Sequence, residues 1–159
     1  MPLNLNIENL SWEWKSFSEL KRDELYEILR FRQEIFVVEQ KSWYLDADGL
    51  DQCSLHLLVS DEGSLIGYLR LTPPGEKYSE ASIGRVSIDE DYRGKRLGDR
   101  LLNMGLEKGK EAYGYGSCRI SAQEYLISYY EKHGFKVQGN PYDEDGIPHI
   151  EMLLDGWPN

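Results

Sequence analysis

The chain has 159 residues, of which 40% are hydrophobic, 12% aromatic and 29% charged. This length and composition fit one compact soluble domain over residues 1–159, and the charged fraction argues against a membrane-embedded protein. The formal net charge of -10 at pH 7 repels nucleic acid phosphates, so a nucleic acid partner is excluded unless one face is strongly basic. The same charge attracts cationic substrates such as amines, or simply keeps the chain soluble.

Neither the start of the chain nor its cysteines suggest an exported protein. The first residues, MPLNLNIENLSWEW, have no basic start followed by an apolar segment, and no apolar run is long enough to span a bilayer. Cys53 and Cys118 are the only cysteines, and neither has the Cys or His spacing that is typical of zinc sites. We therefore expect a cytoplasmic protein with two free thiols, no membrane partner and no metal site.

The first half of the chain contains one helical pattern among strand-like patterns. Apolar residues recur at helical spacing after Ser18, which is a suitable N-cap residue. An acidic loop, YLDADGLDQ, separates this helix from three strands, the first two of which form a hairpin around the turn DEG. The predicted elements are a strand over 11–17, a helix over 18–37, and strands over 54–60, 64–72 and 81–89.

The second half begins with a long amphipathic helix. Its apolar residues are Leu97, Leu101, Leu102 and Leu106, and the stretch AYGYGS ends it. The crossover through this helix predicts that the strands on either side of it are parallel neighbours, so the fold class is α/β (α+β) with a mixed sheet. The predicted elements are a helix over 97–111, a strand over 118–123, a helix over 124–134, and strands over 135–139 and 147–155.

The stretch DYRGKRLGDRLL, at the start of the long helix, has the features of an anion site. A turn before a helix leaves backbone N–H groups unpaired, and Gly94 and Gly98 allow a ligand to approach the backbone closely. Arg93, Lys95 and Arg96 add positive charge, although a solvated helix start is the simpler interpretation. Neither a P-loop nor a GxGxxG dinucleotide motif is present, which argues against nucleotide hydrolysis.

Two stretches around this turn resemble the acetyl-CoA-binding core of the GNAT family of N-acetyltransferases: VSIDEDYRGKRLG and SAQEYLISYYEKHGF. The phosphate loop of that family is usually written Q/R-x-x-G-x-G/A. Arg93 matches its first position and Gly98 its last, whereas Arg96 stands at the middle glycine. LRFRQEIFVVEQ, the DADG loop, IGRVSI and EDGIPHIEM are similar to the ElaA-like branch of the family, where the middle glycine is likewise often missing.

The resemblance implies a single-domain fold with a mixed, splayed central sheet flanked by helices, and acetyl-CoA as cofactor. Tyr130 occupies the position of a tyrosine that protonates the cofactor sulfur in many members, and Gln123 that of an asparagine that contacts the cofactor. Dimerisation is common in the family, so a homodimer is an open expectation. The implied cofactor-binding residues are Val86, Ser87, Ile88, Arg93, Gly94, Lys95, Arg96, Leu97, Gly98 and Gln123.

Acetyl transfer to an amine also needs a group that takes up the amine proton, and the sequence leaves several candidates. Glu39 follows the apolar stretch IFVV, and His149 lies in the ElaA-like stretch DGIPHIEM. His56 lies within an apolar strand, where a buried and hydrogen-bonded histidine is the commoner case. The sequence does not decide among these residues.

Asp46, Asp48 and Asp51 in the acidic loop do not have the spacing of a calcium-binding EF-hand, because Asp51 stands where that loop needs glycine. A solvated loop is the simplest expectation. Recognition of a cationic acceptor is the functional alternative.

The leading interpretation is an acetyl-CoA-dependent N-acetyltransferase that transfers the acetyl group directly to a primary amine of a small molecule or peptide. The alternative is a non-catalytic module that binds acyl-CoA as a sensor or structural ligand. An interaction domain that binds no CoA ranks third. The identity of the amine and the length of the acyl group depend on side-chain geometry that the sequence does not show.

Overall fold

The structure is a computed structural model and describes residues 7–159. Residues 1–6, on which the expectation about export partly rests, lie outside the described residues. No helix within residues 7–159 combines the length and the apolar character that a membrane span needs. The strands are β1 Ser11–Ser16, β2 Leu55–Asp61, β3 Ser64–Thr72, β4 Ser82–Ile88, β5 Cys118–Gln123, β6 Lys136–Glu144 and β7 Ile147–Leu154, and the helices are α1 Arg22–Gln33, α2 Leu97–Tyr113 and α3 Ile127–Glu131.

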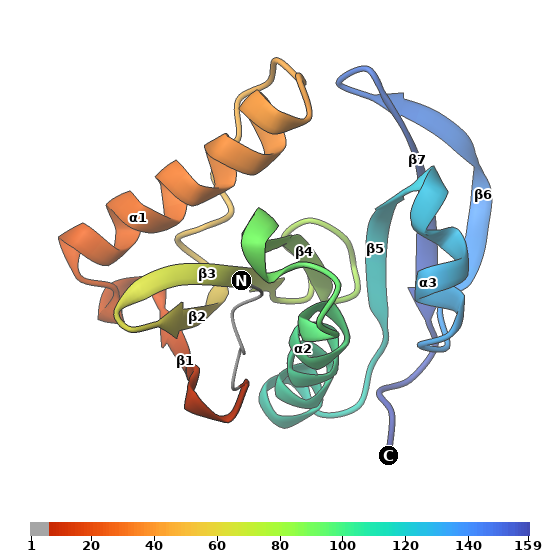
Figure 1. Cartoon of the computed structure of the whole chain (residues 1–159). Coiled ribbons are helices and arrows are strands. Elements are labelled where there is room, and N and C mark those ends of the chain that lie inside the picture. The colour runs from red at the N-terminus through yellow and green to blue at the C-terminus, as the bar shows by residue number, and fades with distance from the viewer. Residues whose placement is uncertain (1–6) are drawn as a thin grey trace.

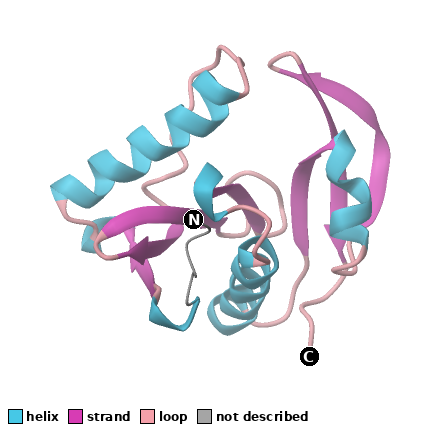
Figure 2. Cartoon of the chain, viewed as in Figure 1, coloured by secondary structure: helices cyan, strands magenta, loops and turns pink. Residues whose placement is uncertain are grey.

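The strands form two antiparallel sheets, of order β1-β2-β3-β4 and β5-β7-β6 (Figures 1 and 2). The sheets meet just before β4 and at the start of β5. There, Ala81 and Cys118 form a parallel bridge, and the Arg119 N–H donates to the Ala81 carbonyl oxygen at 2.9 Å. Beyond this bridge the two strands diverge. The predicted α/β fold with a splayed sheet is therefore confirmed, with parallel pairing of the described strands limited to this bridge.

A bulge in β4 lies where the divergence develops. Tyr68 pairs with Ser87 and Arg70 pairs with Gly84, so β4 has two residues where β3 has one. One of the two, Arg85, has a φ of 51°, in the left-handed region that non-glycine residues rarely adopt. Because a bulge bends the strand that carries the extra residue, we attribute the turning of β4 away from β5 to this irregularity.

Helices α1 and α2 cover opposite faces of the first sheet. Side chains alternate between the two faces along a strand, so Leu57 and Val59 pack in one cluster with the leucines of α2. Leu58, between them, packs with Ile28 and Phe31 of α1. Residues 57–59 of β2 are all apolar because both faces of the strand are covered.

The predicted start of the first helix is wrong. We expected Ser18 as its N-cap, but α1 begins at Arg22. The reason is local: the Ser16 N–H donates to the Glu19 carboxylate at 2.7 Å and closes a separate short turn before the helix. At its other end α1 continues as a π-helical segment, Glu34–Glu39, beyond the predicted end at residue 37.

The predicted end of the sixth strand is also wrong. We expected it to end at Gly139, but β6 continues to Glu144 past Pro141. The pairing with β7 shifts between Gln138 and Tyr142, so a bulge accommodates these residues. Proline is tolerated there because β6 is an edge strand and need not donate to a neighbour on its open side.

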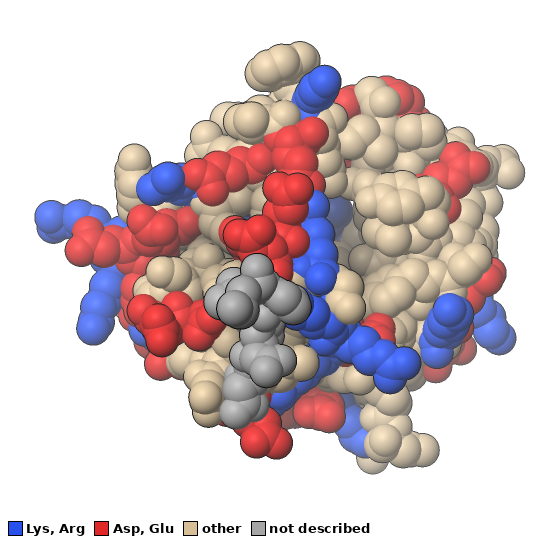
Figure 3. Space-filling view, in the orientation of Figure 1, with Lys and Arg blue, Asp and Glu red and all other residues tan. Residues whose placement is uncertain are grey.

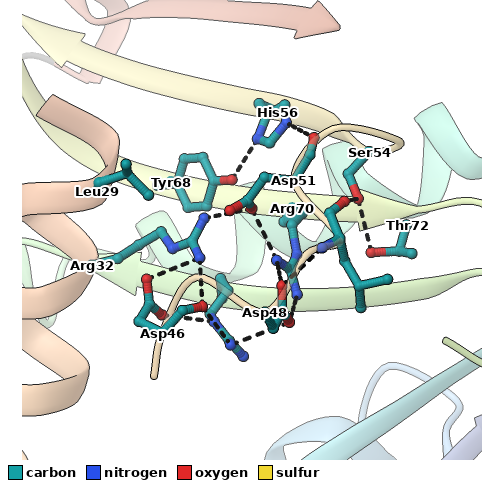
Figure 4. A network of polar contacts seen from close by, with 12 residues as sticks. Leu29, Arg32, Asp46, Asp48, Asp51, Ser54, His56, Tyr68, Arg70 and Thr72 are labelled. Carbon is teal, nitrogen blue, oxygen red and sulfur yellow. Dashed lines mark hydrogen bonds and ion pairs between the residues drawn. The ribbon is translucent and has the colours of Figure 1, made fainter. Parts of the chain in front are cut away.

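The acidic loop is folded against the protein and binds buried arginines (Figure 4). Arg32 of α1 and Arg70 of β3 share Asp51, with Nη1 atoms 2.7 Å and 2.9 Å from its Oδ1. Arg70 also contacts Asp48 at 2.7 Å. Buried guanidinium groups need such partners because desolvation without compensation is costly. The expectation of a solvated loop is therefore wrong, and its carboxylates are already bound to the protein's own cations.

Asp46 and His56 extend this network in opposite directions. The Arg85 Nε lies 2.9 Å from Asp46 Oδ1, which attaches the loop to the β4 bulge. The ring nitrogens of His56 contact the Tyr68 hydroxyl at 2.6 Å and the Asp51 carbonyl oxygen at 2.9 Å. Burial lowers the pKa of His56. His56 is thus a buried core residue with both ring nitrogens hydrogen-bonded, the commoner case for a histidine in an apolar strand.

We predict that Asp51→Asn lowers the free energy of unfolding at neutral pH by about 3–5 kcal/mol, because it leaves two buried guanidinium groups without their shared carboxylate. Denaturant unfolding measures this value. The control is Asp23→Asn, which removes an exposed carboxylate in the first turn of α1 and should cost less than about 1 kcal/mol. A loss below about 1 kcal/mol in Asp51→Asn contradicts the assigned role.

The pH dependence of this difference has a definite sign. Burial alone would raise the pKa of Asp48 and Asp51, but their arginine partners outweigh it and hold the pKa of both carboxyls below the ordinary 3.8. The stability from these pairs is therefore present above that value and is lost as the pH falls through the folded-state pKa values. The difference in the free energy of unfolding between the native chain and Asp51→Asn should therefore shrink below about pH 4. A difference in unfolding free energy that stays constant down to about pH 3 would contradict the role assigned to the Asp51 carboxylate.

Candidate functional site

A cleft of about 460 Å³ opens where β4 and β5 diverge. Val86 and Ile88 of β4 line one wall and Ile120 of β5 lines the other, while Tyr129 and Tyr130 reach it from α3. The end of the π-helical segment and the turn between β6 and β7 also contribute. In the space-filling view the surface is hollowed between the two halves of the molecule (Figure 3).

The β4–α2 loop, residues 89–96, lies at one end of this cleft. Gly94 has a φ of 75° and Arg96 a φ of 61°, and α2 begins immediately after Arg96. The first N–H groups of a helix have no intrahelical partner, so this loop presents unpaired donors. The positive φ of Arg96 lies in the left-handed region that favours glycine, and for an arginine this conformation costs on the order of 1–2 kcal/mol. The loop keeps its conformation without the middle glycine.

The cations of the loop and the first turn of α2 gather on one face. Figure 3 shows a stripe of Lys and Arg side chains between an acidic half and a less charged half of the surface. Within the described chain, Arg96 is exposed and has no carboxylate partner. Lys95 donates to the Asp91 carbonyl oxygen at 3.1 Å. The stripe makes the cleft entrance attractive to an anion in a chain that is acidic overall.

Arg93 is held across the cleft entrance by Glu39. Its Nη1 and Nη2 atoms lie 2.5 Å and 2.9 Å from the two carboxylate oxygens, and its Nε donates to the Ile88 carbonyl oxygen at 3.0 Å. The hydrogen bond from Arg93 lowers the pKa of Glu39. Glu39 therefore joins the end of the π-helical segment to the β4–α2 loop, a contact that the sequence analysis did not anticipate.

Two further contacts follow Glu39 along the chain. The Gln123 side-chain amide donates to Gln40 at 3.2 Å, and the Ser42 hydroxyl donates to the Asp145 carbonyl oxygen at 2.8 Å. Residues 39–42 thus cross the cleft and bind β4–α2, β5 and the β6–β7 turn; we call them the 39–42 crossing. The partners are far apart in sequence, so no local pattern could have revealed this arrangement.

Tyr130 lines the cleft, as the sequence motif requires. Its ring packs edge-on against Phe135 and Tyr129, with centroid separations of 5.8 Å and 5.2 Å. Its hydroxyl has no hydrogen-bond partner within residues 7–159. Burial raises the pKa of Tyr130 to about 12, so the hydroxyl keeps its proton at neutral pH.

His149 lines the cleft from β7 and forms a pair with Glu144. Its Nδ1 donates to the Ile147 carbonyl oxygen at 2.8 Å, which leaves Nε2 as the nitrogen that can take up a proton. That nitrogen lies 3.0 Å from a carboxylate oxygen of Glu144. Glu144 was not among the predicted site residues, although it is the first residue of the ElaA-like stretch EDGIPHIEM, which was a usable signal.

Most of the predicted site residues border the cleft. Leu97 does not: its side chain is buried in the core, so only its backbone can take part in binding. No group of three or more potential metal ligands was found in the described part of the chain. The predicted residues that line the cleft are Val86, Ser87, Ile88, Arg93, Gly98, Gln123, Tyr130, Glu39 and His149, while Gly94, Lys95 and Arg96 lie in the adjoining loop.

Known proteins are similar to this chain in both sequence and fold. Residues 23–155 match the family model described as an acetyltransferase (GNAT) domain. UPF0039 protein sll0451 of Synechocystis is 39% identical over 151 residues, which cover 94% of this chain and 98% of that protein. Protein ElaA of Escherichia coli is 34% identical over 148 residues, which cover 92% of this chain and 97% of ElaA.

Solved structures agree. The crystal structure of Escherichia coli ElaA matches with a TM-score of 0.85 at 33% identity. The match covers 91% of this chain and 98% of the ElaA chain. The crystal structure of an acyl-CoA N-acyltransferase from Pseudomonas aeruginosa has a TM-score of 0.87 at 38% identity, with the same coverage of 91% and 98%. The chain therefore belongs to the GNAT family of acetyltransferases, in its ElaA-like branch.

Proposed function

We propose that the protein transfers an acetyl group from acetyl-CoA directly to a primary amine of a small molecule or peptide, in the cytoplasm. The observation that carries this proposal is one cleft with a basic loop at its entrance and both Tyr130 and His149 on its walls. GNAT acyltransferases use acyl-CoA, and the proposal adds the acetyl group and the amine acceptor.

The residues present fit the cofactor. A Cβ at position 98 would lie 3.4 Å from the Tyr129 hydroxyl and 3.7 Å from Ile88 Cδ1, so glycine keeps a gap there open. Lys95, Arg96 and the free N–H groups of α2 would hold the pyrophosphate. Strand β4 is hydrogen-bonded to β3 on one side, and its other edge beyond the bridge lies open toward the cleft, where pantetheine amides would find partners.

Acyl-CoA supplies the acyl group as a thioester. Bond formation between the amine nitrogen and the acyl carbon breaks the carbon–sulfur bond, and the sulfur leaves with a proton. Tyr130 would donate that proton, because its hydroxyl is protonated, lines the cleft and has no hydrogen-bond partner within residues 7–159. The Glu144–His149 pair would take up the amine proton through water: His149 Nε2, which faces Glu144, would hold the proton, and the carboxylate would stabilise the resulting charge.

Glu39 is a less suitable base than His149. Its carboxylate is bound by both nitrogens of the Arg93 fork, and the lowered pKa of Glu39 weakens it as a proton acceptor. We propose instead that Glu39 positions the 39–42 crossing over the cofactor. Much of the rate would then come from holding amine and thioester in attacking geometry, which can supply roughly 7–11 kcal/mol in favourable cases.

We predict that Lys95→Gln/Arg96→Gln weakens acetyl-CoA binding by on the order of 10-fold or more, because two charge-assisted contacts to phosphate are lost. The measurement is the rise in melting temperature with acetyl-CoA concentration. Lys110→Gln/Lys136→Gln removes the same charge from exposed positions elsewhere and should keep native affinity. Equal affinity in both double variants contradicts the assignment of the loop.

We predict that Tyr130→Phe lowers the rate of amine-dependent thiol release by about 100-fold, the usual contribution of a positioned acid, while acetyl-CoA binding is unchanged. Tyr26→Phe, at an exposed position on α1, is the control and should keep the native rate. A Tyr130→Phe rate within about twofold of native would remove Tyr130 from the mechanism. Binding of acetyl-CoA without thiol release for any amine would instead favour the non-catalytic module.

A further inference from the structure

Lys77 lies on the cleft wall at the end away from the basic loop. It belongs to the connection between β3 and β4 and precedes the first residue of β4, Ser82, whereas the β4–α2 loop follows the last, Ile88. Glu144, on the β6–β7 hairpin, lines the same cleft, and its charge acts on Lys77. Lys77 therefore shares this part of the cleft wall with Glu144.

Among the described residues, Lys77 differs from the arginines of the cleft wall in having no counter-ion. Arg93 is bound by Glu39, and Arg85 is bound by Asp46 at 2.9 Å. Within residues 7–159, no carboxylate lies within ion-pair distance of the Lys77 ammonium, which lies 5.4 Å from the Tyr78 ring centroid.

The surroundings make this cation receptive to an anion. Lys77 is solvent-exposed as a residue, but the concave walls remove part of the hydration of its ammonium. This burial lowers the pKa of Lys77, and the nearby charge of Glu144 compensates only in part. An ammonium that is poorly hydrated and unpaired gains more from an incoming anion than a freely solvated one does.

We propose that Lys77 binds a carboxylate of the acceptor, so that the preferred acceptor is an amine that also carries a carboxylate, as amino acids do. The inference rests on the proposed transfer to an amine. Glu144 and His149 then attract the amino group while Lys77 fixes the other end, which orients the acceptor in the cleft. A single ammonium suits a monoanionic carboxylate, whereas phosphate is more often met by arginine forks or several donors.

The test compares amino acids with the amines that they become on decarboxylation, so that each pair differs in the carboxylate alone. Lysine with cadaverine, ornithine with putrescine, and phenylalanine with phenethylamine are suitable, and phosphoethanolamine with ethanolamine tests phosphate. The measurement is kcat/KM from thiol release with acetyl-CoA. The native protein should favour the carboxylated member of at least one pair by about 10-fold or more, and phosphate should confer no such preference.

Lys77→Ala should lower kcat/KM for the carboxylated amine by about 10-fold or more and change its decarboxylated partner by less than about twofold. Lys77→Arg should retain part of the preference because it keeps the charge. Lys136→Ala, which removes an exposed lysine on β6, should behave as the native protein does. A fall in kcat that is equal for both members of a pair would mean that Lys77 acts in proton transfer, and would overturn the inference.

A binding measurement separates this inference from the proposed function. Calorimetry with free CoA present measures the affinity of each pair without turnover, and the Lys77→Ala effect on the carboxylated amine should persist there. Thiol release that is absent for every amine, with this binding preference intact, would reject the transferase proposal and keep the anion site. No carboxylate preference in either binding or turnover, or a preference that Lys77→Ala retains, overturns the anion site.

Discussion

The divergence of β4 from β5 is the constraint on which the rest of this structure depends. Two neighbouring strands that stayed paired would satisfy each other's backbone and leave no room between them. Here the pairing is confined to the Ala81–Cys118 bridge, and the strands separate beyond it. The cleft and the open edge of β4 both result from this separation. The side chains that we propose for the chemistry, Tyr130 and His149, are brought to its walls by α3 and β7.

The buried arginine–aspartate network gives this gap a fixed shape. Arg85 supplies the extra residue of the β4 bulge and also binds Asp46, so the irregularity that separates the strands is attached to the acidic loop. Arg32 attaches the same loop to α1. Charges that are paired in the interior tolerate few alternative arrangements, because an unpaired one is costly. The acidic loop is thus a structural element that is attached to α1 and β4, and is not a solvated connection.

Electrostatics divides the cleft into two ends of different character. Unpaired donors and cations of the β4–α2 loop make one end suitable for phosphate, although the chain carries a net charge of -10. At the other end, Glu144 with His149 and Lys77 present both signs of charge across a small space. Such an arrangement suits a zwitterionic ligand, which carries one positive and one negative charge. The 39–42 crossing, held by Arg93 and Gln123, spans the region between the two ends.

Local pattern in the sequence determined much of the fold. The leucine spacing after Arg96 specified α2, and the predicted strand over 118–123 coincides with β5, because periodicity reports directly which side chains face a core. Motifs in the right order also identified the family, and the stretch SAQEYLISYYEKHGF carries Tyr130, which lines the cleft. Gly139 and Pro141 misled the prediction of β6, since a bulge in an edge strand admits residues that otherwise mark turns.

The partners of the charged side chains were decided only in the tertiary structure. The sequence shows Asp51, Glu39 and Lys77 as similar polar residues in exposed-looking segments. Folding buries the first between two arginines and binds the second to Arg93. It leaves the third in a cleft without a counter-ion among the described residues. These outcomes depend on contacts between residues that lie far apart in the chain, and the packing of helices on sheets sets those contacts. Periodicity carries no information about such contacts, because it describes only which face of one element is apolar.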